Sequence, residues 1–65
     1  MTDLRGYTAR QLLACALREI SQRQRVYPRF VEKGSMTQAQ AKVQIDMMEA
    51  IAEHFAEMVE KERLL

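Results

Sequence analysis

Apolar residues recur along the first half of the chain at the spacing of an α-helix. They share one helical face, in steps of three, four and seven residues: Ala9, Leu13, Leu17, Ile20, Tyr27 and Val31. Thr8 precedes this run and Gln11 stands three residues after Thr8, which is the capping-box pattern of a helix N-terminus. Because Gly34 suits the left-handed cap that ends a helix, the pattern predicts one helical segment from Ala9 to Gly34.

Pro28 interrupts this first helical segment. Inside a helix, proline removes the hydrogen bond to residue 24 and costs about 3 kcal/mol. The apolar face nevertheless keeps its phase, since Tyr27 and Val31 continue it, and this favours a helix kinked near residues 24–28. The competing interpretation is a break, with Pro28 at the first position of a short separate helix.

A second helical segment begins after the turn at residues 34–37. Thr37 and Gln40 repeat the capping-box pattern, and Met36 can pack back onto Ala41. Neither glycine nor proline occurs in the rest of the sequence. Two segments of similar length, joined by so short a turn, predict an all-α fold, an antiparallel helical hairpin.

Residues 1–7 are expected to form a partly ordered lead-in, and residues 8–65 a single hairpin domain. If the turn sets the register, residues whose numbers sum to about 72 face each other across the seam, the line of contact between the two helices. The predicted layers set large side chains against small ones in several places: Val31/Ala41, Tyr27/Ile45, Gln24/Met48, Ile20/Ala52, Leu17/Phe55 and Leu13/Val59.

A second apolar stripe lies beside the seam on each helix. On the second helix it is rotated by roughly 80–120° from the seam, and on the first helix it falls to the same side. Its members are the predicted oligomer interface: Leu12, Ala16, Phe30, Met47, Ile51 and Met58. One antiparallel neighbour cannot cover so wide an apolar face. A homodimer forming a four-helix bundle is the simplest assembly, and an amphipathic helix of another protein is the alternative occupant.

The composition favours association. A chain of 65 residues buries only about 60% of its unfolded surface and is marginal as a monomer. One cysteine excludes an internal disulfide, and with one histidine it cannot form a structural zinc site, so no metal or cofactor is expected. The lone Cys15, the lack of an apolar leader and the lack of ~20 consecutive apolar residues predict a cytoplasmic protein without a membrane segment.

Charge is distributed unevenly, although the net charge is only +1. Residues 1–34 carry seven basic and three acidic side chains, whereas residues 35–65 carry three basic and six acidic ones. A basic strip is predicted on the outer face of the first helix: Arg18, Arg25, Arg29 and Lys33. Such a strip can contact an acidic protein or a phosphate backbone, and an ordinary solvated surface is the simpler interpretation.

No side chains combine into a catalytic constellation. His54 has no second ligand or base at helical spacing on its face, and Cys15 has no base to activate it. We therefore expect a histidine at the rim of an interface and a cysteine that packs. The carboxylates of the second helix share one polar face, which indicates solvation rather than acid–base chemistry. The sequence predicts a protein that is not an enzyme and has no small-molecule substrate.

Residues 25–31 read RVYPRFV and are followed by Gly34 and by Met36–Thr37, and residues 45–51 read IDMMEAI. This pattern resembles a family of small uncharacterised proteins from proteobacterial genomes, often in prophage regions. The resemblance implies a bacterial or phage-associated accessory protein and no activity. Our leading expectation is a non-enzymatic protein–protein interaction module, an adaptor or inhibitor. The alternative is an accessory nucleic-acid-binding protein that uses the basic strip.

Overall fold

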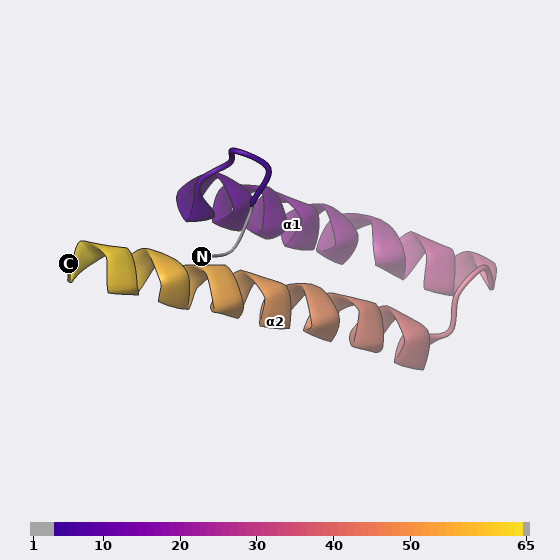
Figure 1. Cartoon of the computed structure of the whole chain (residues 1–65). Helices are drawn as coiled ribbons and strands as arrows, with labels where there is room; N and C mark the ends of the chain where they lie inside the picture. The colour runs from indigo at the N-terminus through magenta and orange to yellow at the C-terminus, as the bar shows by residue number, and fades with distance from the viewer. Residues whose placement is uncertain (1–3, 65) are drawn as a thin grey trace.

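Two α-helices lie side by side and antiparallel in the computed structural model, which describes residues 4–64 (Figure 1). Helix α1 spans Ala9–Lys33 and helix α2 spans Gln38–Arg63. No strand occurs in the described part of the chain. The predicted all-α hairpin is confirmed. Of the predicted lead-in, residues 1–3 lie outside the described residues, as does residue 65 of the predicted domain.

Both helices begin with the predicted capping boxes. The Gln11 amide donates to the Thr8 hydroxyl at 3.1 Å, and the Thr8 amide donates to Oε1 of Gln11 at 2.9 Å. The Gln40 amide donates to the Thr37 hydroxyl at 3.0 Å, and the Thr37 amide donates to Oε1 of Gln40 at 2.9 Å. Each box gives partners to two backbone donors that a helix start leaves unpaired. Local sequence therefore fixes both helix N-termini.

Gly34 ends α1 with a left-handed φ of 83°. Its amide donates to the carbonyl groups of Phe30 and Val31, and the Ser35 amide donates to the Phe30 carbonyl at 2.9 Å. These bonds satisfy carbonyl groups that the end of the helix leaves open. A side chain at position 34 would meet nothing within 4 Å. Glycine is needed there because of its backbone angle, which costs other residues roughly 1–2 kcal/mol.

Helix α1 continues without interruption through Pro28. The predicted alternative of a break, with a separate short helix after it, is therefore wrong. The proline ring removes the amide donor that would have reached the carbonyl of Gln24. Tyr27 and Val31, on either side of the proline, are both partly buried. Packing of this apolar face against α2 offsets the lost hydrogen bond, since tertiary contacts supply most helical stability in proteins.

Small residues line the seam. The buried residues of the described chain are Ala9, Ala16, Ile20, Ala41 and Ala52. Ala16, Ile20 and Ala52 form one cluster, with Leu13 and Met48 packed against it. The predicted Ile20/Ala52 layer is therefore confirmed.

The predicted Leu17/Phe55 layer is wrong. Leu17 is 51% exposed, whereas Ala16, one residue earlier, is 5% exposed and belongs to the core cluster. The methyl groups of Ala16 and Ala52 allow the helices to approach closely, and a leucine between them would hold the backbones apart. The actual seam on α1 alternates steps of four and three residues, as in a coiled coil: Ala9, Leu13, Ala16 and Ile20.

The hairpin is rod-shaped, with extents of 47 × 18 × 17 Å and a radius of gyration of 14.5 Å. A compact domain of the same length has a radius of gyration of about 11 Å. Within residues 4–64, neither helix combines the length and the apolar character needed to cross a membrane. Residues 4–64 form two helices, so no further helix of the described chain covers either flank of the seam (Figure 1).

Candidate interaction surface

An apolar stripe follows one side of α2 next to the seam. Met47, Ile51 and Met58 follow Gln44 by three, seven and fourteen residues, so they project from its side of the helix. Nη1 of Arg23 on α1 donates to the carbonyl oxygen of Gln44 at 2.9 Å. Because Gln44 lies on the side of α2 that carries the stripe, this hydrogen bond shows that the side of α1 carrying Arg23 lies next to the stripe.

The apolar residues of α1 lie on the side of Arg23. Phe30 follows Arg23 by seven residues and Leu12 precedes it by eleven. The apolar flank, as we define it, consists of five predicted interface residues that the fold brings to one side of the hairpin: Leu12, Phe30, Met47, Ile51 and Met58. Phe30, Met47 and Ile51 are 38%, 48% and 45% exposed, and Leu12 and Met58 are partly buried.

Ala16 is the exception among the predicted interface residues. It is buried in the seam with Ile20 and Ala52, so it stabilises the hairpin and is closed to a second chain. Val43 is not among the predicted interface residues, yet it is 52% exposed and borders the apolar flank near the turn. Its position four residues before Met47 is the signal that identifies it.

A charged pair lies in the middle of the apolar flank. Nε of Arg23 donates to Oε1 of Glu19 at 2.9 Å, and the guanidinium lies 5.9 Å from the centre of the Tyr27 ring. The Arg23 and Glu19 side chains are 21% and 46% exposed. Arg23 therefore joins its own helix to α2 while keeping one edge open to solvent. This pair was not predicted, although its spacing of four residues is the usual one for a helical ion pair.

The basic strip is exposed along α1, on the face turned away from the seam. Lys33 follows Arg18 by fifteen residues, so the strip is about 22 Å long. Among the described residues, none of its four members forms an ion pair. These cations are therefore accessible to an anionic partner.

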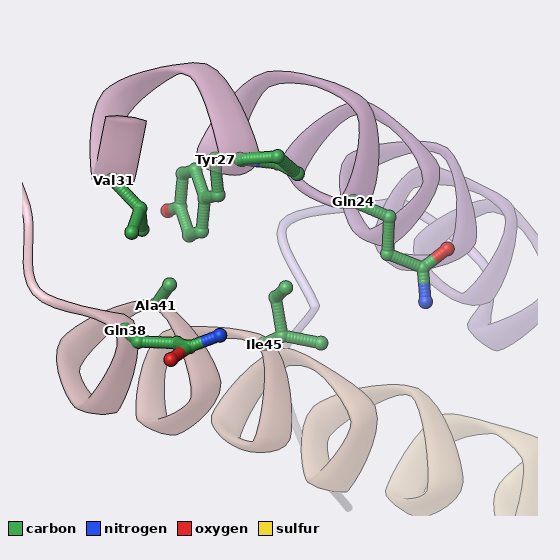
Figure 2. A pocket seen from close by; sticks show the side chains of 7 residues that line it. Gln24, Tyr27, Val31, Gln38, Ala41 and Ile45 are labelled. Atoms are coloured by element: carbon green, nitrogen blue, oxygen red, sulfur yellow. The ribbon is translucent and has the colours of Figure 1, made fainter. Parts of the chain in front are cut away.

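A pocket of about 340 Å³ opens between the helices next to the turn (Figure 2). It is lined by Gln24, Tyr27, Pro28, Val31, Gln38, Ala41 and Ile45. The Tyr27 ring extends from α1 toward α2, where the side chains of Gln38, Ala41 and Ile45 lie along the other side of the pocket (Figure 2). Gln24 and Pro28 lie on the other side of Tyr27 from Arg23, so the pocket opens on the flank opposite the apolar flank. No carboxylate, histidine or cysteine is among its lining residues, and the pocket was not predicted.

The other candidate side chains lie apart. His54 is exposed, and its ring meets that of Phe55 edge to face at 5.4 Å. Cys15 is exposed, so its predicted packing role is wrong. Residues 4–64 contain no group of three His, Cys, Asp or Glu side chains placed to hold a metal ion. On α2, Asp46 accepts a hydrogen bond from Nζ of Lys42 at 2.8 Å, and this bond and the carboxylate charge raise the pKa of Lys42.

Comparison with known proteins identifies no relative. No protein-family model matches the chain, and no curated protein or solved structure matches it either.

Proposed function

We propose that this protein is a non-enzymatic protein–protein interaction module that works as a homodimer. The apolar flank carries the proposal, because Phe30, Met47 and Ile51 are exposed along one side of a hairpin whose buried core is mostly alanine. Two copies paired through this flank would form a four-helix bundle with the large side chains at its centre.

The exposed area of the chain supports the homodimer. Its solvent-accessible surface is 5460 Å². A compact monomer of 7.6 kDa is expected to expose about 4,300 Å². The difference, roughly 1,200 Å², is larger than the roughly 800 Å² that each partner buries in a standard stable interface. A second copy is therefore sufficient to cover the surplus surface.

The content of the core supports the same conclusion. Among the described residues four of the five buried ones are alanines, and no large side chain is fully buried. Most hydrophobic stabilisation comes from leucine, isoleucine, methionine and aromatic side chains, at about 1.5–3 kcal/mol for each one fully buried. Those side chains are present here but remain partly exposed. Association completes their burial.

We further propose a role as a cytoplasmic adaptor or inhibitor that occupies the surface of another protein. The lone Cys15 supports a reducing compartment. The resemblance of residues 25–31 to a prophage-associated family favours a phage or bacterial accessory protein. Arg29 is exposed, belongs to that motif and has no part in the seam, so it is the first residue to substitute when a partner is tested.

Thermal unfolding at different protein concentrations tests the homodimer. Association stabilises the folded state by mass action, so the melting temperature should rise when the concentration increases from about 5 μM to about 500 μM. Circular dichroism at the helical bands measures it. A melting temperature that stays constant across this range would contradict the proposal.

Accessory nucleic-acid binding is the second candidate function. The exposed cations of the basic strip, none of them in an ion pair within residues 4–64, are the observation that favours it. Four phosphate contacts would make the logarithm of duplex-DNA affinity fall with the logarithm of salt concentration at a slope of about −3.6. Arg25→Gln with Arg29→Gln should reduce that slope, whereas Lys42→Gln on α2 should not. No retention on duplex DNA at low salt would eliminate this candidate.

A further inference from the structure

We infer that each helix of the proposed homodimer packs against its own copy, α1 against α1 and α2 against α2, antiparallel about a two-fold axis. The inference rests on that homodimer and adds its orientation and register. Two hairpins related by a two-fold axis and joined through one flank have two possible arrangements. In the first, each helix meets its own copy. In the second, α1 of each copy meets α2 of the other.

The residue pattern of α1 favours the first arrangement. When a helix pairs antiparallel with its own copy, residues at equal distances from the axis face each other. Leu12 and Phe30 are equally far from residue 21, and so are Glu19 and Arg23. A single axis at that level therefore sets leucine against phenylalanine and carboxylate against guanidinium.

The apolar residues of α2 indicate a two-fold axis at the same position along the hairpin. Met47 and Ile51 are equally far from residue 49. Ile20 on α1 lies in the cluster with Ala52 and Met48 of α2, so residues 21 and 49 stand at nearly the same height in the hairpin. The axis that pairs α1 with its copy thus also sets Met47 against Ile51 of the second copy.

Arg23 retains a donor for the second copy. Its Nε donates to Glu19 and its Nη1 to the carbonyl of Gln44 within the same chain. Arginine has five N–H donors, so the Nη2 group is left to reach Glu19 of the other copy. The result is a closed network of two carboxylates and two guanidinium groups at the centre of the interface. Such a network also distinguishes a second copy from an unrelated apolar helix.

The second arrangement pairs these residues badly. Its two-fold axis runs parallel to the helices, so each residue keeps its position along the helix direction. Residues of α1 therefore meet residues of α2 that lie at the same position along the hairpin. This sets Glu19 near Ile51 of the second copy and Arg23 near its Met47. The Glu19 carboxylate would lose water and gain no new partner, which is unfavourable. Apolar side chains would face charged ones along the whole centre of the interface.

The first arrangement places the two basic strips on one face. The two copies of α1 become neighbours, with axes about 8–10 Å apart, and both strips point away from the bundle. Repulsion between them is moderate, because charges on outward-pointing side chains are screened over about 8 Å at physiological salt. The dimer then presents the four cations of each basic strip, eight in all, on one face. This is the surface that the nucleic-acid-binding candidate requires.

Mixing two singly charge-reversed variants tests the arrangement. Glu19→Arg leaves four cations and no carboxylate at the centre of its homodimer, and Arg23→Glu leaves four carboxylates and no cation there, so both homodimers should be weakened. In the mixed dimer every facing pair is opposite in charge, although the pair within each chain is still broken. After subunit exchange, ion-exchange chromatography should show mixed dimer well above the half expected from random pairing.

Glu32→Arg and Arg25→Glu form the matched control pair. They make the same charge changes on α1, but Glu32 and Arg25 are exposed on its outer face, away from the apolar flank. Their mixture should contain about half mixed dimer, as random pairing gives. If the Glu19/Arg23 mixture also stays at half, each helix does not meet its own copy and the inference is wrong. If the wild-type chain is a monomer, the proposed homodimer itself is wrong.

A cross-linking variant provides a test that keeps the charged pair intact. The variant combines Leu12→Cys and Phe30→Cys with Cys15→Ser. Positions 12 and 30 are about 27 Å apart along one helix, so they cannot be joined within a chain. A short bismaleimide should therefore join two chains covalently in the first arrangement. Exclusively single chains on a denaturing gel, from a sample that is dimeric before treatment, would overturn the inference.

Discussion

Ile51→Glu is the substitution that separates the apolar flank most sharply from the rest of the surface. Ile51 is 45% exposed in the hairpin. Complete burial of an isoleucine side chain is worth about 1.5–3 kcal/mol, so covering the exposed part contributes about 1 kcal/mol per chain and about 2 kcal/mol per dimer. With glutamate at position 51, this contribution to dimer stability is lost.

The introduced carboxylate adds a second cost. Burying a polar group without a partner costs at least about 1 kcal/mol, and a dimer would contain two such groups. The total is at least about 4 kcal/mol, which corresponds to about a thousandfold increase in the dimer Kd. Size-exclusion chromatography with light scattering should therefore report a monomer for Ile51→Glu at concentrations where the wild type is dimeric.

Leu17→Glu is the matched control. Leu17 is 51% exposed, close to the value for Ile51, but it lies on the pocket flank, seven residues before Gln24. Glu53→Lys, on the acidic face of α2, controls for a change of charge alone. Both controls should stay dimeric, and circular dichroism should show that all variants are helical. If Leu17→Glu dissociates as fully as Ile51→Glu, the interface has been assigned to the wrong flank.

Three further substitutions test what holds the hairpin together, each by urea unfolding at one fixed protein concentration. Gly34→Ala should lower the free energy of unfolding by roughly 1 kcal/mol, because a φ of 83° is strained for a residue with a side chain; an unchanged value would show that the turn relaxes freely. Ile20→Ala should cost about 2–5 kcal/mol, because Ile20 is the only large side chain among the buried residues of the described chain. A smaller loss would mean that the core lies elsewhere. Pro28→Ala should stabilise the protein by up to about 3 kcal/mol, since it restores an amide donor to the Gln24 carbonyl, and destabilisation would show that Pro28 has a packing role.

Local signals predicted most of the fold. Thr8 and Thr37 begin the helices where their capping boxes indicate, and Gly34 ends α1. These features depend on a few neighbouring residues, so they can be interpreted without knowledge of the tertiary structure. Pro28 is the opposite case, because whether a helix continues through a proline depends on how well its flanking residues pack.

The position of the seam could not be predicted to one residue. Ala16 and Leu17 both fit helical periodicity, and hydrophobicity favours leucine. The choice of Ala16 depends on the close approach of Ala52 from the other helix, which is a tertiary contact. The hydrogen bond from Arg23 to the carbonyl of Gln44 was unpredictable for the same reason. This bond depends on how the two helices are shifted and rotated relative to each other, and the periodicity within each helix gives no information on either.

Sedimentation equilibrium of the wild-type chain tests the central claim most directly, namely that a second copy covers the apolar flank. At about 50 μM, above the Kd expected for an interface of standard size, we expect twice the chain mass of 7.6 kDa. A helical species with the mass of one chain at that concentration would contradict it, because Phe30, Met47 and Ile51 would then be stable in water without a partner.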